Sequence, residues 1–122
     1  MFSTSREMLA YLRKEEIAAI DLKFCDLMGR WHHLTSSARK IDDSLFSHGE
    51  GFDASNMAGF KTVEAGDMVL VPDPTTAFLD PFFDLPTLSV ICDVKEAATR
   101  APFARDPRGL LARAEAYLKA TG

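Results

Sequence analysis

The first third of the chain changes from a helical to a strand pattern of hydrophobic positions. Residues 4–7 have the spacing of a capping box, and the apolar residues that follow share one face, which predicts a helix over 5–14. Apolar and polar residues then alternate over 17–27, as in a half-buried strand. A turn at Gly29 leads to a return strand over 31–35, so the two strands should form a hairpin.

Further strand signals occupy the second half of the chain. Residues 41–46 are compatible with a short helix, and 68–71 are continuously apolar, which is typical of a strand buried on both faces. The prolines after this run should end it, because proline cannot donate to a sheet ladder. We expect another short strand over 75–79 and a longer one over 87–94. These strands and the hairpin predict one mixed sheet.

A last helix is expected to begin at Asp106 and Pro107, which are favoured residues at the N-cap and at the first helical position. Its apolar positions share one face: Leu110, Leu111, Ala114, Tyr117 and Leu118. Such a face needs a covering segment, so we expect more chain to follow. The predicted fold class is α+β, with a helix packed on a mixed sheet and flanking helices near both termini.

Composition narrows the possible classes of protein. The 122 residues are 47% hydrophobic and 26% charged, which favours a soluble globular domain. A net charge of −4 without a basic cluster argues against nucleic acid as the partner. No apolar run reaches the roughly 18 residues of a membrane span, and no signal peptide is evident, so we expect a cytoplasmic protein without a membrane partner. Cys25 and Cys92 are interpreted as buried free thiols.

The stretch 51–61 has neither a helical nor a strand period and is bounded by glycines. It places the carboxylate of Asp53 near the polar side chains of Ser55 and Asn56. A surface loop of this kind can carry binding groups. From the residues alone, the favoured interpretation is that Asp53 caps its own loop through the backbone of Ser55 or Asn56.

Other polar residues carry weaker signals. His32 and His33 are adjacent on a predicted strand, so they should point to opposite faces and not share a metal, and each is expected to be exposed or to face a partner. No phosphate-binding glycine loop, zinc-ligand spacing or nucleophile elbow occurs. Several carboxylates beside prolines or a glycine are interpreted as turn caps: Asp67, Asp73, Asp80 and Asp84.

Taken together, these segments resemble the N-terminal β-grasp domain of glutamine synthetases. The similarity covers nearly the whole chain in order, and the Phe52–Asn56 stretch is similar to the Phe-Asp-Gly-Ser-Ser loop of that family. The other similar segments are the hairpin 21–33, the strands within 67–82 and 86–94, and the Arg105–Arg108 entry into the catalytic domain. The resemblance divides the chain into an N-terminal helix (1–15), a β-grasp domain (16–104) and the first helix of a C-terminal catalytic domain (105–122).

The resemblance implies an ATP-dependent ligase that joins glutamate and ammonia through γ-glutamyl phosphate. Members of the family bind ATP and Mg or Mn in the larger C-terminal domain, which this chain lacks beyond its first helix. We therefore expect the 122 residues to be a piece of a longer enzyme, to bind no cofactor or metal themselves and to be inactive alone.

In the family, subunits form a ring, expected here to be a dodecamer, and the N-terminal domain covers the active site of a neighbouring subunit. The resemblance gives Asp53 the role of binding ammonium and removing its proton, and it assigns Asp53, Ser55 and Asn56 to the ammonium-binding loop. Ala54, Asn56 and Phe60 depart from the family pattern of glycine, serine and tryptophan. These departures leave open a γ-glutamyl ligase that uses another amine. A separate alternative is a stand-alone β-grasp interaction module.

Overall fold

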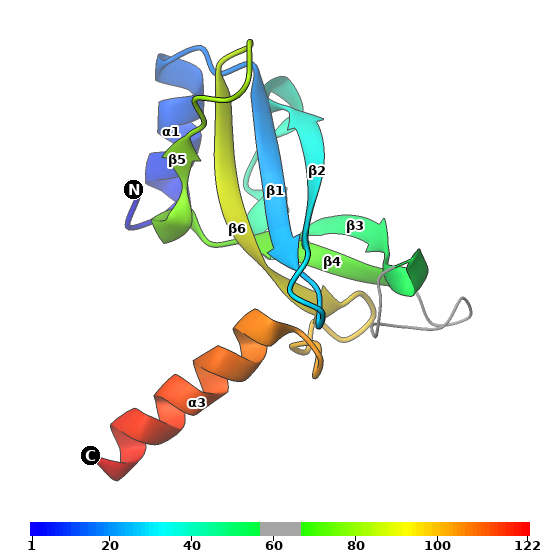
Figure 1. Ribbon diagram of the computed structural model, residues 1–122. Coiled ribbons are helices and arrows are strands. Elements are labelled where there is room, and N and C mark those ends of the chain that lie inside the picture. Colours follow the sequence, from blue (N-terminus) through cyan, green and yellow to red (C-terminus); the bar gives the residue numbers. More distant parts are fainter. Residues whose placement is uncertain (57–66) are drawn as a thin grey trace.

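A computed structural model describes residues 1–56 and 67–122, and Figure 1 shows the arrangement of the elements. In chain order they are α1 (Ser5–Lys14), β1 (Ala19–Cys25), β2 (Trp31–Ser37), the 3-10 helix η1 (Ala38–Lys40), α2 (Ser44–Ser47), β3 (Glu50–Asp53), the 3-10 helix η2 (Ala54–Asn56), β4 (Asp67–Pro72), the 3-10 helix η4 (Pro74–Thr76), β5 (Phe78–Leu79), β6 (Thr87–Glu96) and α3 (Pro107–Thr121).

The strands of the described residues form one mixed sheet in the order β2-β1-β6-β4-β3. The long strand β6 is central: β1 pairs with it in parallel, with Ala19 opposite Thr87. Along its other edge, β5 and then β4 pair with it antiparallel. The predicted hairpin is confirmed, because β1 and β2 pair antiparallel from Ala19–Ser37 to Cys25–Trp31.

Alternation in β1 separates an apolar face of the sheet from a polar one. Ile20, Leu22 and Phe24 are buried in the main hydrophobic cluster, together with Met8 and Leu12 of α1. The helix α1 therefore packs against the apolar face, as its predicted stripe requires. Thr4 accepts a hydrogen bond from the Glu7 amide at 3.2 Å, which is the N-cap of the expected capping box. The expected α+β architecture is confirmed.

Three expectations about elements need correction. The stretch 51–61 was predicted to have no strand, but it begins within β3, which pairs with β4. Gly51 carries no side chain, so the alternation of apolar and polar residues is hidden in β3, and the strand forms only because it pairs with β4. Residues 57–61 lie outside the described residues. Within 75–79, only Phe78–Leu79 is strand, because Pro74 begins a 3-10 turn capped by Asp73. The short helix predicted over 41–46 occupies Ser44–Ser47.

The helix α3 extends away from the sheet (Figure 1). As predicted, Asp106 is its N-cap: Oδ1 accepts from the Arg108 amide at 3.2 Å, and Oδ2 accepts from the Val94 amide at 3.0 Å. Arg108 also donates from Nε to Asp93 Oδ1 at 2.8 Å and pairs with Asp73. The start of α3 is thus fixed to β6. Its predicted apolar face is exposed, with Leu111 at 70% and Tyr117 at 72%.

Candidate functional site

Asp53 is the last residue of β3 and lies opposite Asp67, the first residue of β4, at one corner of the sheet. Both residues are exposed. The Ser55 amide donates to Asp53 Oδ1 at 2.9 Å, whereas the next residue after Asp53, Ala54, is fully buried. Asn56 ends the 3-10 turn η2. A buried alanine therefore anchors the loop beneath a solvent-facing carboxylate.

The described residues place two carboxylates at this corner. Hydrogen bonds from the backbone and then the side chain of Ser55 hold the pKa of Asp53 below its ordinary value, so the carboxylate is ionised at neutral pH. Asp67 on the opposing strand contributes a second carboxylate to the same corner. The bond to Ser55 is the local cap that the sequence left open. It does not preclude a ligand, because a carboxylate offers about four acceptor sites.

A second polar group, which the sequence reasoning did not identify, lies on the polar face of the sheet around Asp21. Asp21 is fully buried. Its Oδ1 lies 2.7 Å from His33 Nδ1 and accepts from Thr35 Oγ1 at 2.7 Å. Its Oδ2 has no hydrogen-bond partner of good geometry among the described residues, but the Lys23 ammonium lies 2.9 Å away as its charge partner. We call this set the Asp21 network.

Lys23 extends the Asp21 network towards β5 and β6. Its Nζ lies 3.6 Å from Asp80 Oδ2, which accepts a 2.6 Å hydrogen bond from Ser89 Oγ. Asp80 also accepts from the Phe82 amide at 3.0 Å, so its predicted role as a turn cap is confirmed. The signal that the sequence offers for this network is the pair of opposite charges, Asp21 and Lys23, at alternate positions of β1. Only the register of the sheet shows which neighbouring strands supply their partners.

The two histidines point to opposite faces, as predicted, and the expectation of an exposed ring holds for His33 but is wrong for His32. His32 is half-buried: its Nε2 lies 2.8 Å from Asp26 Oδ2, and its ring stacks on Phe24 with centroids 5.4 Å apart. His33 remains largely exposed but is bonded to Asp21. Both rings therefore stabilise the hairpin.

The cysteines are free thiols, as expected, with Cys25 half-buried and Cys92 buried. Burial raises the pKa of both thiols, which keeps them protonated at neutral pH. Within residues 1–56 and 67–122, no group of three His, Cys, Asp or Glu side chains is placed to hold a metal ion. In the same ranges, no helix combines the length and apolar character needed to cross a membrane.

Comparison with known proteins gives this geometry a context. Residues 16–97 match the family model described as glutamine synthetase, β-grasp domain. A glutamine synthetase of Azorhizobium caulinodans is 44% identical over 119 residues, which is 98% of this chain and 25% of that protein. A 3-hydroxylaminophenol mutase of Cupriavidus pinatubonensis is 40% identical over 122 residues, which is 100% of this chain and 26% of that protein.

The fold is also similar to that of a solved structure. A cryo-EM structure of Plasmodium falciparum glutamine synthetase superposes with a TM-score of 0.90 at 21% identity, covering 98% of this chain and 23% of that chain. This chain spans about a quarter of the length of the curated relatives that it matches. The family match covers most of the chain and includes the strand that ends in Asp53. The chain therefore belongs to the glutamine synthetase family, of which it contains the β-grasp domain.

Proposed function

We propose that this chain is the N-terminal domain of a longer ATP-dependent glutamate–ammonia ligase that acts through γ-glutamyl phosphate. The observation that carries the proposal is the 44% identity to a glutamine synthetase over nearly the whole of this chain. In the longer protein, residues 105–122 would be the first helix of the catalytic domain. The exposed apolar face of α3 would then be covered by that domain.

In this proposal, Asp53 helps to bind ammonium and to remove its proton. An ionised, exposed carboxylate can hold a small cation by charge and by accepting its hydrogen bonds. Loss of a proton from bound ammonium then exposes the nitrogen lone pair that attacks the acyl phosphate. The lowered pKa of Asp53 keeps its carboxylate ionised, which both binding ammonium and accepting its proton require. Ser55 donates a hydrogen bond that orients the Asp53 carboxylate, and Asn56, the last residue of η2, would contribute to the same ammonium site.

Other parts of the reaction belong outside this chain. No group of three metal-ligating side chains lies together within residues 1–56 and 67–122, and the sequence has no phosphate-binding glycine loop. We place the sites for ATP and for Mg or Mn in the rest of the longer protein. Subunits would form a ring, with Asp53 of one subunit facing the active site of its neighbour.

The 122-residue chain alone should therefore form no glutamine. Purified chain, incubated with ATP, Mg²⁺, glutamate and ammonium, is expected to give the same glutamine signal as a reaction without protein, measured by chromatography. ATP-dependent accumulation of glutamine would show that the groups placed elsewhere are in this chain after all.

In the full-length protein, Asp53→Asn should lower the turnover number with ammonium by about 100-fold, the scale of a general acid–base contribution. The amide keeps the size of the side chain but loses its charge. Steady-state rates measured across ammonium concentrations would give the turnover number and KM separately, and size-exclusion chromatography would show whether the oligomer is unchanged.

The matched control is Asp67→Asn, which removes the same charge from the opposite position of the same corner. We expect a smaller loss of turnover than in Asp53→Asn, because Asp67 would act only through its charge and not by accepting hydrogen bonds from ammonium. Equal losses of turnover in the two variants would mean that Asp53 acts only through its negative charge and not by direct contact with ammonium. A panel of alkylamines and a hydroxylaminophenol substrate, assayed in parallel, tests the alternative nucleophile and the reaction named for the Cupriavidus relative.

A further inference from the structure

The turn that follows β6 lies at the same end of the sheet as Asp53. Glu96, the last residue of β6, is opposite Met68 of β4, and Met68 is in turn opposite Phe52 of β3. Asp53 is the next residue after Phe52 and ends β3. The turn is closed by the Arg100 amide, which donates to the Glu96 carbonyl at 2.9 Å. A side chain on this turn is therefore well placed to act on the strand that carries Asp53.

The backbone of Arg100 is in a conformation that arginine rarely adopts. Its φ is 63°, in the left-handed region that favours glycine. Among the described residues other than glycine, only Glu16 shares a positive φ. A residue of this kind costs stability and persists only where the surrounding structure holds it, which is common where the side chain has a task. The contact that the Arg100 side chain makes should therefore explain the conformation.

The Arg100 guanidinium reaches the entrance of β3. Its Nη1 donates to the carbonyl of His48, the C-cap of α2. Carbonyls at the end of a helix have no partner within the helix, so they need a donor from elsewhere. Gly49 follows and fits tightly against β4, because a Cβ there would lie 2.9 Å from the Leu70 carbonyl oxygen. Arg100 thus fixes the point at which the chain turns into β3.

This tether matters because few other contacts hold β3. The strand has four residues, Glu50–Asp53, and it is the outermost strand of the described sheet, so it pairs on one side only (Figure 1). A segment with few contacts opens more easily than the centre of a sheet. Pairing with β4 holds one edge of β3, the buried Ala54 holds its far end, and Arg100 holds its beginning. Loss of the Arg100 bond would let the beginning of β3 shift and would displace Asp53 with it.

We propose that Arg100 is a positioning residue for Asp53: it fixes the entrance of β3, so that the carboxylate at the other end of the strand keeps its place for ammonium. The inference rests on the proposed role of Asp53. Arg100 acts without touching the substrate, because the atom it holds is a backbone carbonyl five residues before Asp53. Small displacements are enough, since a misplacement of about 1 Å can cost about 100-fold in rate.

The test uses Arg100→Gly in the full-length protein. Glycine accepts a positive φ, so the variant removes the backbone strain together with the bond to His48, and these two effects on stability oppose each other. The Tm should therefore stay near that of the parent. The KM for ammonium should rise about tenfold, part of the loss that a 1 Å misplacement can cause, whereas the KM values for glutamate and ATP should not change. Partial unfolding would instead lower the turnover number and leave all three KM values unchanged.

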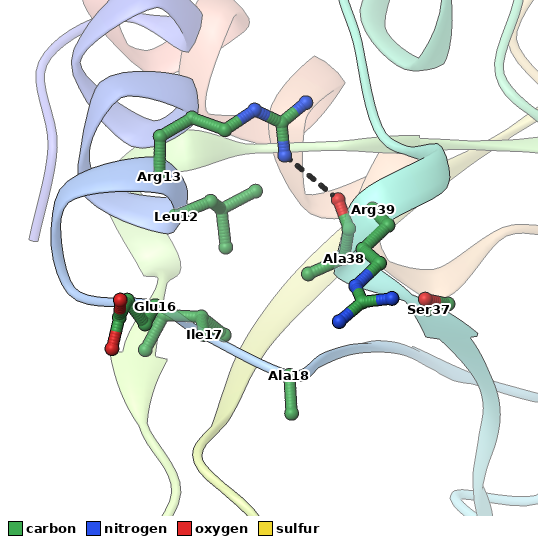
Figure 2. Close-up of a pocket in the computed structure, with 8 residues that line it drawn as sticks. All are labelled: Leu12, Arg13, Glu16, Ile17, Ala18, Ser37, Ala38 and Arg39. Atoms are coloured by element: carbon green, nitrogen blue, oxygen red, sulfur yellow. Dashed lines mark hydrogen bonds between the residues drawn. The ribbon is translucent and has the colours of Figure 1, made fainter.

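Glu16→Gly is the matched control for the relief of strain. Figure 2 shows Glu16 in the connection between α1 and β1. Because β1 starts opposite Thr87, the first residue of β6, Glu16 lies at the opposite end of the sheet from Asp53. Its φ of 51° is also left-handed, so glycine should raise the Tm and leave the KM for ammonium unchanged. Arg100→Asn is a second test variant, because asparagine tolerates the left-handed region but has a much shorter side chain, and it should behave like Arg100→Gly.

A double-mutant cycle separates this inference from the role of Asp53 itself. If Arg100 acts through Asp53, adding Arg100→Gly to Asp53→Asn should not lower kcat/KM for ammonium any further. The inference alone is overturned if Asp53→Asn lowers turnover but both Arg100 variants keep the parent's KM for ammonium, or if the double variant shows the product of the two single losses. If Asp53→Asn leaves the kinetics with ammonium unchanged, the proposed role of Asp53 is wrong, and this inference is overturned with it.

Discussion

Gly49→Ala should destabilise this domain by about 3 kcal/mol, through two separate costs. Gly49 has a φ of 77°, directly after the C-cap of α2, and a side chain in this region is strained by about 1 kcal/mol. A Cβ there would also lie 2.9 Å from both the Leu70 carbonyl oxygen and Val69 Cβ. Because β4 is backbone-paired on both sides, it can shift only by disturbing the sheet, an overpacking cost of about 2 kcal/mol.

Chemical unfolding in urea, followed by circular dichroism, would measure the loss. The matched control is Gly51→Ala, two residues later in β3, where an added Cβ meets nothing within 4 Å. This control should lie within about 0.5 kcal/mol of the parent. Equal midpoints for the two variants would mean that the contact with β4 relaxes freely. Because Gly49 immediately precedes β3, the same substitution in a full-length ligase should also displace Asp53 and lower activity.

Asp21→Ala should also destabilise the domain by about 3 kcal/mol, because it removes the centre of the Asp21 network. Truncation of one member of a buried pair typically costs about 3–5 kcal/mol. The lower end applies here, because Lys23 is 27% exposed and keeps Asp80 as a neighbour at 3.6 Å. The loss of stability also includes the hydrogen bonds that His33 and Thr35 make to Asp21, because these bonds help to hold β2 to β1.

The same carboxylate should contribute to the loss of stability in acid. Burial alone would raise the pKa of Asp21, but hydrogen bonds from His33 and Thr35 and the nearby Lys23 ammonium together hold it below the ordinary value of 3.8. A carboxyl group with a lowered pKa in the folded state contributes stability that is present above pH 3.8. That contribution disappears as the pH falls through the lower, folded pKa. Asp21→Ala should therefore flatten the decline in stability below this pH.

Urea unfolding of the parent and Asp21→Ala at a series of pH values from neutral to acid tests both statements. Thr35→Val is the matched control: it removes one hydrogen bond to Asp21 but leaves the charge and the bond from His33. It should cost about 1 kcal/mol and keep most of the pH dependence. If Asp21→Ala lost stability in acid as steeply as the parent, the pH dependence would have to arise from other carboxylates.

The candidate site was only partly readable in the sequence. Asp53 stood out because a carboxylate, a serine and an asparagine lay in a glycine-bounded stretch, and the resemblance gave it a role. The strand beneath it was missed, since four residues that include Gly51 form a strand only when β4 supplies the partner.

Local chemistry in the sequence determined the helix ends and the main strands. Thr4 and Asp106 cap helices through neighbouring amides, and the alternation in β1 assigns each side chain to a face, so neither depends on distant partners. The tertiary structure alone decided which charges meet. Asp21 and Lys23 of β1 come close to Asp80 because β1 and β5 both pair with the first residues of β6, and Asp80 directly follows β5. The contact between Lys23 and Asp80 joins residues far apart in the chain, and only the register of the folded sheet sets the distance between them.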